Sequence, residues 1–283
     1  MKLLRFGPAG RERPGLLAAD GVIRDLSGVL FELGPRQLAP ESLDLLRGMD
    51  LATLPLMTEP TRLGPPVSGV GKIVGIGLNY RDHAAESGLA LPSEPVMFLK
   101  PASCIAGPSD PLAQPPDATK LDHEVELAVV IGSTARRVSR AEALSFVAGY
   151  AVMNDVSERG WQLERGSQWD KGKGGDGFAP FGPYLVTADE VPDPQALRLW
   201  CTVNGEARQD GSTADMVFPV DELVSYVSRF MTLYPGDIIT TGTPAGVGLG
   251  HKPEPRWLRI GDVIEMGVDG LGVQRTEVVA SSD

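Results

Sequence analysis

Two glutamates separated by one residue stand out as groups that could do chemistry. They lie in the segment 121–127, which reads LDHEVEL, as Glu124 and Glu126. Side chains alternate between the two faces of a β-strand, so both carboxylates project from one face. The wholly apolar residues 128–131 predict that this strand enters the core. Two like charges at the mouth of a core strand repel each other and are costly to desolvate.

A divalent cation would remove this cost, and oxygen ligands favour Mg²⁺, Mn²⁺ or Ca²⁺ over zinc. A third carboxylate, Asp155, follows the apolar run 150–153, where another buried strand is expected to meet a loop. Three carboxylates at strand ends leave metal positions open for water and substrate, which suits Lewis-acid chemistry. The alternative is that the glutamates line a solvated edge and that Asp155 caps a helix starting near Ser157.

A histidine and a carboxylate at helical spacing form a candidate acid–base pair. His83 and Glu86 are three residues apart in a short predicted helix, with Asp82 as its N-cap. A histidine oriented by a carboxylate is a common general base. The alternative is an ordinary pair on a helix surface. Gly88 could let the segment 84–92 act as a lid.

Two glycine-rich segments are candidates for holding an anionic substrate. Lys173 lies in the segment 171–177 (KGKGGDG), where a cation on a flexible loop could hold a carboxylate or an enolate; the alternative is a plain mobile loop. The segment 241–248 (TGTPAGVG) follows a predicted strand, and its N–H groups and hydroxyls could bind an anion; the alternative is a tight turn. Lys100 and Arg81 are further candidate partners for an anion.

The elements that must position these groups are mostly strands. The 34 glycines and 24 prolines indicate many turns, and Asn204-Gly205 predicts a tight hairpin. Strands are predicted at 3–4, 16–17, 22–23, 72–78, 96–99, 124–131, 238–241 and 262–266, and helices at 41–47, 82–87, 221–231 and from Ser139, which with Glu142 resembles a capping box. Because helices do not alternate regularly with strands, we expect a β-rich α+β fold and not a doubly wound one.

Composition argues against several classes of protein. The chain has 283 residues and a net charge of −11, and an acidic chain without a basic stripe is a poor nucleic-acid binder. Its longest apolar run, 127–131, is far too short for a membrane span, and its first ten residues lack the apolar stretch of a signal peptide. Cys104 and Cys201 fit buried thiols in a reducing compartment. We expect a soluble cytoplasmic protein without nucleic-acid or membrane partners.

Seven segments occur in an order that resembles the fumarylacetoacetate hydrolase family. They lie between Lys72 and the C-terminus, about three quarters of the chain, and read GLNYRDHAAE, EPVMFLKP, HEVELAVVIG, GYAVMNDVSER, a lysine before DGFAPFGP, VNGEARQ and PGDIITTGTPAGVG. The resemblance implies a mixed β-sandwich roll with a small N-terminal β domain, usually dimeric, so we expect a homodimer. With the linker signal at 61–66, it predicts an N-terminal domain over 1–65 and a catalytic domain over 66–283.

The resemblance implies that Mg²⁺ or Mn²⁺ is held by Glu124, Glu126 and Asp155, and that His83 and Glu86 form the dyad that activates water. The fumarylacetoacetate hydrolases proper carry an additional upstream aspartate ligand. That aspartate has no counterpart here, which fits the three-carboxylate branch and argues against fumarylacetoacetate itself as the substrate.

Three further roles are implied by the same resemblance. The family's active-site lysine corresponds to Lys173, counted back from Pro180, and Lys171 is the less favoured choice. Gln162 matches a position that orients water or substrate. Thr243, in the TGTP motif, matches a position that holds the substrate carboxylate.

The implied activity is hydrolysis of the C3–C4 bond of a 2,4-diketo acid, or acylpyruvate, to pyruvate and a carboxylic acid. The N-terminal PGLL and DGVIRDLSG are similar to the bacterial branch that acts on diketo-deoxy sugar acids. In that branch the substrate would be 2,4-diketo-3-deoxy-L-rhamnonate or -fuconate, giving pyruvate and lactate or a similar acid. The alternatives are oxaloacetate decarboxylase, ureidoglycolate lyase or isomerase activity at the same metal site, and a catalytically silent binding protein.

Overall fold

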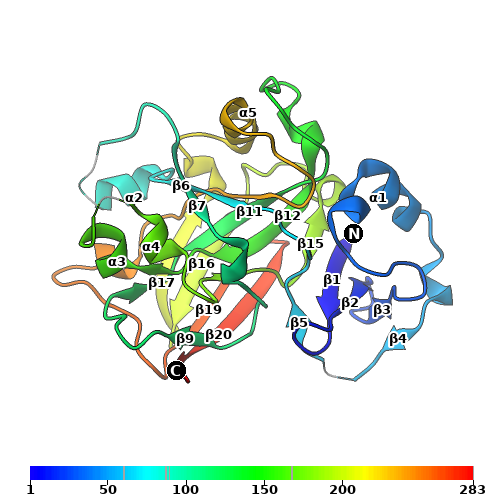
Figure 1. Ribbon diagram of the computed structural model, residues 1–283, viewed down its shortest axis with the longest axis horizontal. Helices are drawn as coiled ribbons and strands as arrows, with labels where there is room; N and C mark the ends of the chain where they lie inside the picture. The colour runs from blue at the N-terminus through cyan, green and yellow to red at the C-terminus, as the bar shows by residue number, and fades with distance from the viewer. Residues whose placement is uncertain (60, 87, 89, 167, 283) are drawn as a thin grey trace.

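Two β-sheets form the framework of the chain (Figure 1). The computed structural model describes residues 1–59, 61–86, 88, 90–166 and 168–282. The larger sheet has 11 strands, in the order β4-β3-β2-β1-β15-β12-β11-β18-β6-β7 with β5 paired to β1. These strands are β1 Lys2–Phe6, β2 Arg13–Leu17, β3 Ile23–Asp25, β4 Leu56–Met57, β5 Leu63–Gly64, β6 Ile73–Gly77, β7 Val96–Lys100, β11 Val125–Ile131, β12 Val147–Asn154, β15 Leu185–Thr187 and β18 Ile238–Thr240.

The smaller sheet has five strands in the order β17-β16-β19-β20-β9. They are β9 Leu112–Gln114, β16 Arg198–Val203, β17 Glu206–Ser212, β19 Val263–Val268 and β20 Gly272–Ala280. Two short pairs complete the strands, β8 Ile105–Ala106 with β14 Ala179–Pro180 and β10 Leu121–Asp122 with β13 Ser157–Glu158.

The helices are short. The α-helices are α1 Pro40–Arg47, α2 Arg81–Glu86, α3 Arg159–Leu163, α4 Asp170–Lys173 and α5 Val220–Phe230. The 3₁₀ helices are η1 Pro35–Leu38, η2 Leu51–Thr53, η3 Ala102–Cys104, η4 Ala143–Phe146, η5 Ala188–Glu190, η6 Thr213–Asp215 and η7 Gly248–Gly250. The predicted β-rich α+β class is confirmed, as are the helices expected at 41–47 and 221–231.

Strand β11 lies in the middle of the larger sheet and carries the predicted glutamate segment. It pairs antiparallel with β12 on one side and with β18 on the other. All of its residues are buried, as its unbroken apolar run favours for a strand covered on both faces. Strand β18 in turn pairs in parallel with β6. The start of β11 and the ends of β12, β18 and β6 therefore meet at one end of the sheet.

The smaller sheet packs against this central part of the larger one. Strands β16 and β19 contact β11, and β20 contacts β12. The predicted hairpin joins β16 to β17, and Asn204 and Gly205 take φ values of 53° and 77°, the left-handed pair that such a two-residue turn requires. Both cysteines, Cys104 and Cys201, are free and buried, as predicted.

The N-terminal strands continue the larger sheet at one side of the molecule (Figure 1). Strand β1 pairs with β2 on one side and with β15 on the other. Strands from both of the predicted domains therefore share one sheet. The division of the chain between residues 65 and 66 stays a prediction.

The helix predicted from Ser139 is wrong. The Ser139 hydroxyl does donate to the Glu142 carboxylate, at 2.6 Å, but residues 139–146 form only turns and the short η4. From Val147 onward the chain forms strand β12. The strand's pairing with β11 contributes more to stability than the local preference for a helix.

Helix α2 forms where predicted, but Asp82 is not its N-cap. Asp82 lies inside the first turn, and its carboxylate accepts hydrogen bonds from the N–H groups of His83 and Ala245, at 2.7 and 3.2 Å. Ser87, the predicted last residue of this helix, and residue 89 of the predicted lid segment 84–92 lie outside the described residues.

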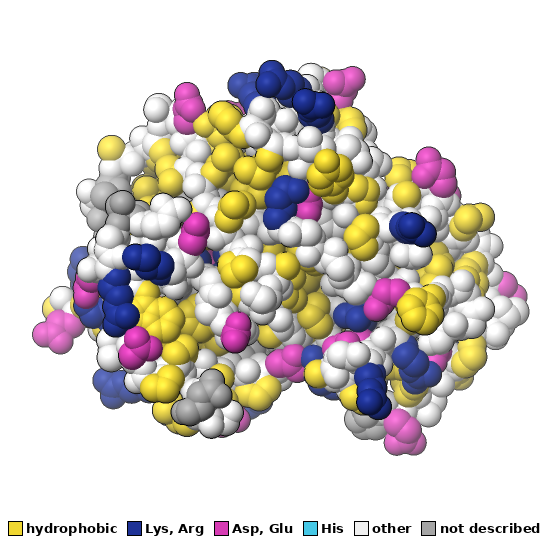
Figure 2. All heavy atoms as spheres, viewed as in Figure 1, with side chains coloured by type: hydrophobic (Ala, Val, Ile, Leu, Met, Phe, Trp, Pro, Cys, Tyr) yellow, Lys and Arg dark blue, Asp and Glu magenta, His cyan; other side chains and the backbone are white. Residues whose placement is uncertain are grey.

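The surface carries charges of both signs. Figure 2 shows Lys and Arg side chains interspersed with Asp and Glu over one face of the molecule. Among the described residues, every helix is too short or too polar to cross a membrane.

Candidate active site

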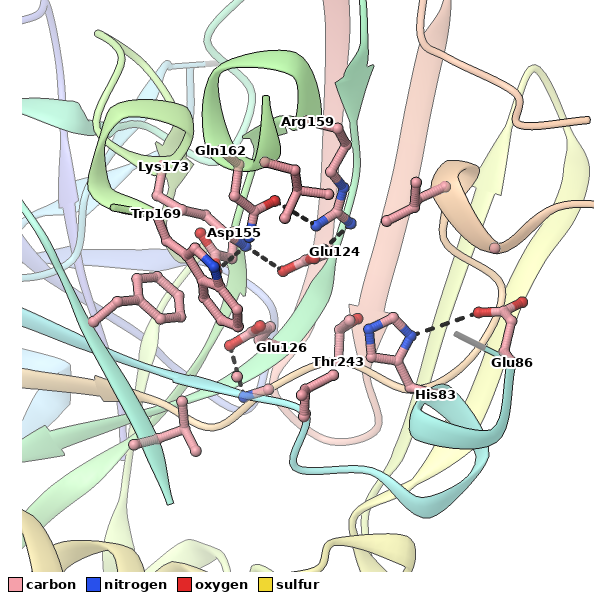
Figure 3. A pocket seen from close by; sticks show the side chains of 18 of the residues that line it. His83, Glu86, Glu124, Glu126, Asp155, Arg159, Gln162, Trp169, Lys173 and Thr243 are labelled. Carbon is pink, nitrogen blue, oxygen red and sulfur yellow. Dashed lines mark hydrogen bonds and ion pairs between the residues drawn. The ribbon is translucent and has the colours of Figure 1, made fainter. Parts of the chain in front are cut away.

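A cavity of about 460 Å³ lies where the strand ends meet. The segments that leave these ends supply its walls: the residues around the start of β11, the chain from β12 into α3, the glycine-rich segment after β18, and α2 after β6. Helix α4 and strand β7 contribute further lining residues. Figure 3 shows the charged and polar side chains that converge in this cavity.

The three predicted metal ligands meet on the cavity floor. Glu126, in β11, and Glu124, directly before it, project to the same side, as strand alternation predicts. Asp155 follows β12, and its N–H donates to the Glu124 carbonyl oxygen at 2.9 Å, which locks the two strand ends together. One oxygen of each carboxylate lies within 4.8 Å of the others, and all three residues are buried.

Two cations neutralise one side of this triad. Lys173 Nζ lies 2.7 Å from both Glu124 Oε2 and Asp155 Oδ2, and Arg159 Nη2 lies 2.6 Å from Glu124 Oε1. Burial alone would raise the pKa of Glu124, but the fields of Lys173 and Arg159 outweigh it and lower that pKa to about 2. Glu124 is therefore a carboxylate anion at neutral pH.

Glu126 has the opposite environment. Its Oε2 accepts hydrogen bonds from the Thr240 hydroxyl and, at 2.9 Å, from the Gly242 N–H. Burial, followed by the neighbouring charges of Asp155 and Glu124, raises the pKa of Glu126 well above its ordinary value. The ionised form of Glu126 is therefore disfavoured as long as no further positive charge lies beside it.

Lys100 lies behind the triad and does not line the cavity. Its side chain is fully buried, with Nζ 2.6 Å from Asp155 Oδ1 and a second hydrogen bond to the Lys173 carbonyl oxygen. The hypothesis that Lys100 contacts a substrate anion does not fit this position. Its ammonium instead holds Asp155 from the side opposite to Lys173.

The charges in and behind the cavity floor fit a bound cation. Four buried carboxylates share this region with three buried cations: the acids are Asp122, Glu124, Glu126 and Asp155, and the cations are Lys100, Arg159 and Lys173. Among the described residues, no cation pairs with Glu126. An all-oxygen donor set with one uncompensated charge suits Mg²⁺ or Mn²⁺.

The predicted acid–base pair faces the triad across the cavity (Figure 3). His83 Nδ1 lies 3.5 Å from Glu86 Oε2, longer than a normal hydrogen bond. Both oxygens of Glu86 accept from the Gly246 N–H, at 3.1 Å each. Gly250 packs directly on this carboxylate, because a Cβ at position 250 would lie 2.2 Å from Glu86 Cδ. The glycine-rich segment thus fixes the orientation of the pair.

That segment binds protein carboxylates with the N–H groups that were predicted to hold a substrate anion. Besides those of Gly242 and Gly246, the N–H group of Ala245 donates to Asp82, and those of Gly248 and Leu249 donate to Asp122, at 2.7 and 3.1 Å. The anion-binding hypothesis for this loop is therefore replaced by a role in positioning the acidic residues around the cavity.

Lys173 does not lie on a flexible loop. It ends helix α4 and is buried. Gly172 allows α4 to pack closely on α3, since a Cβ there would lie 2.5 Å from Gln162 Cβ, and this packing carries the Lys173 ammonium to the triad. Lys171 Nζ instead donates to the Arg165 carbonyl oxygen at 2.6 Å.

Of the three remaining predicted site residues, two line the cavity and one does not. Gln162 and Thr243 line the cavity. Gln162 Oε1 accepts from Arg159 at 3.0 Å, whereas the Thr243 hydroxyl already donates to the Val125 carbonyl oxygen at 2.8 Å. Arg81 does not line the cavity, and its Nη1 donates to the carbonyl oxygens of residues 215 and 216.

Two buried residues were missed from the sequence. Arg159 connects Glu124 to Gln162, and Asp122 holds Arg159 through an Nε contact of 2.8 Å. Burial opposes both ionised forms, but the pairing lowers the pKa of Asp122 and raises that of Arg159. The sequence did contain a signal for both residues, because each lies close to a predicted metal ligand in a segment already singled out. Arg159 ends the segment GYAVMNDVSER, and Asp122 lies two residues before Glu124.

The apolar wall of the cavity was also missed. Phe98 in β7 and Trp169 before α4 lie side by side, with ring centroids 5.8 Å apart. Gly77 makes room for this wall, because a Cβ there would lie 2.5 Å from Trp169. No spacing rule identifies such residues, since their meeting depends on tertiary packing.

Glu126→Gln tests whether the uncompensated charge is the site of cation binding. In metal-free protein the variant should be at least as stable as the wild type at pH 7. The raised pKa of Glu126 means that its favourable contribution is present below the ordinary value of 4.5 and is lost as the pH rises through the raised pKa. Saturating Mg²⁺ or Mn²⁺, about 100 times the dissociation constant, should stabilise the wild type by about 2.7 kcal/mol and the variant far less, as measured by thermal unfolding.

Glu41→Gln, which removes an exposed carboxylate in α1, is the matched control and should keep the full metal response. Equal stabilisation of wild type and Glu126→Gln by metal would contradict this interpretation of the triad.

Comparisons with known proteins agree with the geometry. The profile described as fumarylacetoacetate (FAA) hydrolase, C-terminal, matches residues 72–279. A relative from Burkholderia ambifaria, whose name specifies no more than a hydrolase, is 57% identical over 274 residues, which cover 97% of each chain.

Several solved structures cover the whole of this chain, among them the following two. One, described as a probable 2-hydroxyhepta-2,4-diene-1,7-dioate isomerase from Mycobacterium abscessus, is 34% identical with a TM-score of 0.84 and is itself covered completely. The other is maleylpyruvate hydrolase from Sphingobium sp. SYK-6 in complex with manganese(II) ion and pyruvate, 31% identical with a TM-score of 0.83 and also covered completely. With the profile match across most of the chain, these similarities establish that the protein belongs to the fumarylacetoacetate hydrolase family.

Proposed function

We propose that this protein is a metal-dependent hydrolase that cleaves the C3–C4 bond of a 2,4-diketo acid, releasing pyruvate and a carboxylic acid. The observation that carries this proposal is that one cavity holds the carboxylate triad with Lys173 on one side and the His83–Glu86 pair on the other. The reaction needs both halves, because one must stabilise an enolate and the other must activate water. Similarity to a maleylpyruvate hydrolase bound to manganese and pyruvate supports the same class.

The floor of the cavity would bind the diketo acid head. Mg²⁺ or Mn²⁺ held by Glu124, Glu126 and Asp155 would supply Lewis-acid polarisation of the substrate oxygens. The Lys173 ammonium favours negative charge on the C2 oxygen as it develops, which is usually the largest catalytic contribution. Gln162 accepts from Arg159 through its oxygen, so its NH₂ group is the end that can orient a water or a substrate oxygen.

The His83–Glu86 pair would activate the water. Glu86 faces Nδ1 of His83, which favours the proton on that nitrogen and leaves Nε2 as the base. His83 Nε2 takes a proton from water as the water oxygen bonds to C4 of the substrate. Glu86 holds the imidazolium that results, and the Gly246 N–H holds Glu86.

Bond cleavage then returns the proton. The C3–C4 bond breaks, and its electron pair passes through C3 to the C2 oxygen as an enolate beside Lys173. C4 leaves as the carboxyl group of the acid product. His83 delivers its proton to C3, so that one water has been consumed and pyruvate is released.

A second candidate is isomerisation, which the similarity to the described dioate isomerase favours. Moving a proton along an unsaturated diacid requires a base such as His83 but consumes no water. Oxaloacetate decarboxylation and ureidoglycolate cleavage would likewise use the cavity floor without hydrolysis.

The first test is pyruvate release from acetylpyruvate, oxaloacetate and 2,4-diketo-3-deoxy-L-rhamnonate, each with Mg²⁺, with Mn²⁺ and with EDTA. We expect EDTA-sensitive release from the diketo acids, together with the matching carboxylic acid. Ureidoglycolate is included with urea as the readout. Release from oxaloacetate alone would replace the proposal by a decarboxylase.

His83→Ala should lower kcat for diketo acid hydrolysis by about 10²–10⁴-fold, the usual contribution of a positioned acid–base group. Metal binding should persist, because His83 is not one of the triad carboxylates, and metal-dependent thermal stabilisation measures it. An unchanged kcat would remove His83 from the mechanism.

Gly250→Ala should displace the Glu86 carboxylate, because the added Cβ would overlap it. A displacement of about 1 Å can cost about 10²-fold in rate, so we expect kcat to fall by about 10- to 100-fold with the metal response retained. Gly28→Ala, where a Cβ meets nothing within 4 Å, is the control. Equal kcat values for the two variants would show that the packing of Gly250 on Glu86 does not matter for catalysis.

A further inference from the structure

The ammonium of Lys173 contacts two carboxylates and one aromatic ring. Its Nζ lies 2.7 Å from Glu124 Oε2 and 2.7 Å from Asp155 Oδ2. An ammonium has three N–H groups, and the third has no hydrogen-bond acceptor among the described residues. Instead, Nζ lies over the ring of Phe98, 5.1 Å from its centroid. This distance is within the roughly 6 Å over which a cation is attracted to the negative face of an aromatic ring.

The ring of Phe98 is held in place by other contacts. Its cross-strand partner is Gly75 in β6, and a Cβ there would lie 2.2, 2.4 and 2.7 Å from the ring carbons Cζ, Cε2 and Cε1. Because these distances are similar, the face of the ring, and not its edge, lies against Gly75. Trp169 also packs on the ring, with centroids 5.8 Å apart and planes at 59°. The sheet and Trp169 therefore set the position of the ring without Lys173.

A third contact matters because two contacts do not fix the position of the ammonium. With only two distances set, Nζ could still swing about the line that joins the two carboxylate oxygens, since the lysine stem is flexible. Attraction to the ring favours the arrangement in which Nζ lies over Phe98. Lys173 is only 2% exposed, and a cation–π attraction is strongest where water is excluded.

A ring also leaves the ammonium available to the substrate. An oxygen atom in its place would accept the third N–H in a strong hydrogen bond, whereas a π face attracts the charge as a whole. The third N–H can then turn to the C2 oxygen as negative charge develops there. A divalent cation on the triad would share the two carboxylates that hold Lys173, but it would not compete for the ring.

We propose that Phe98 is a positioning residue, whose ring face holds the Lys173 ammonium where it stabilises the developing enolate. This inference rests on the proposed hydrolase function and adds one residue to it. A displacement of about 1 Å can cost about 10²-fold in rate, so a weaker attraction should lower kcat. KM should change little, because the negative charge on the C2 oxygen develops in the transition state and not in the bound substrate.

The test weakens the attraction and keeps the shape of the side chain. Phe98 is replaced by 4-fluoro-, 3,5-difluoro- or 3,4,5-trifluorophenylalanine, because each fluorine withdraws electrons from the π face and adds little volume. The same replacements of Phe181 are the control. That ring is fully buried, and among the described residues no Lys or Arg lies over it.

The first readout is the stability of the metal-free protein in urea, which does not depend on activity. The unfolding equilibrium constant should rise with each fluorine at position 98, by about five- to thirtyfold for three fluorines, which corresponds to about 1–2 kcal/mol. The Phe181 series should show no such rise. In a Trp169→Leu background the rise at position 98 should persist, and its disappearance would assign the effect to Trp169 and overturn the proposal.

The second readout is steady-state hydrolysis of acetylpyruvate with Mg²⁺. Across the Phe98 series, kcat should fall in the same order as stability and over a similar five- to thirtyfold range, about 1–2 kcal/mol in the barrier. KM should stay nearly constant, and the Phe181 series should keep the wild-type kcat.

The two proposals fail in different ways. If the unmodified enzyme releases no pyruvate from any diketo acid, the hydrolase function is wrong, and the role of Phe98 in enolate stabilisation is wrong with it. If pyruvate is released but fluorination at position 98 leaves stability unchanged, the contact with Lys173 is overturned. If stability falls and kcat does not, the hydrolase function stands and the positioning role of Phe98 is overturned.

Discussion

Carboxylates buried side by side at the start of β11 are the constraint on which the rest of the structure depends. Each buried negative charge needs a nearby cation or several hydrogen-bond donors. Without them, the free-energy cost of removing the charge from water would exceed the free energy gained on folding. Here the cations come from three separate elements: Lys100 from β7, Arg159 from α3 and Lys173 from α4. Segments far apart in the sequence must therefore dock at one strand end, and the same docking encloses the cavity.

The glycine-rich segment after β18 provides hydrogen-bond donors for carboxylates on both sides of the cavity. Its N–H groups donate to Glu126, Asp82, Glu86 and Asp122, so one loop holds acids that belong to both halves of the site. Such a loop needs glycine where backbone approaches backbone. A Cβ at Gly246, which has a φ of +104°, would lie 1.9 Å from the Arg208 carbonyl oxygen. The relative positions of the triad and the His83–Glu86 pair are thereby fixed through main-chain atoms.

The sequence predicted well those site residues whose placement depends only on the local spacing along a strand or a helix. Strand alternation placed Glu124 and Glu126 on one side, and helical spacing placed His83 beside Glu86. What it missed depended on long-range packing: Lys100 was expected at the substrate but lies behind Asp155, and Arg159 and the Phe98–Trp169 wall were not singled out. The helix expected after Ser139 was lost to strand pairing for the same reason. The homodimer and the cytoplasmic location stay predictions.

The pairing of β1 with β15 has a consequence for the chain as a whole. Without residues 1–65, β15 would become the outer strand of the sheet that carries the carboxylates, with its N–H and C=O groups open to pairing with another chain. The N-terminal strands instead place the edge at β4, which is two residues long and so offers a poor template for association. None of the described residues in 1–59 and 61–65 lines the cavity. The N-terminal strands thereby cover the edge of β15 without taking part in the cavity, so the sheet edge and the site are maintained by separate segments of the chain.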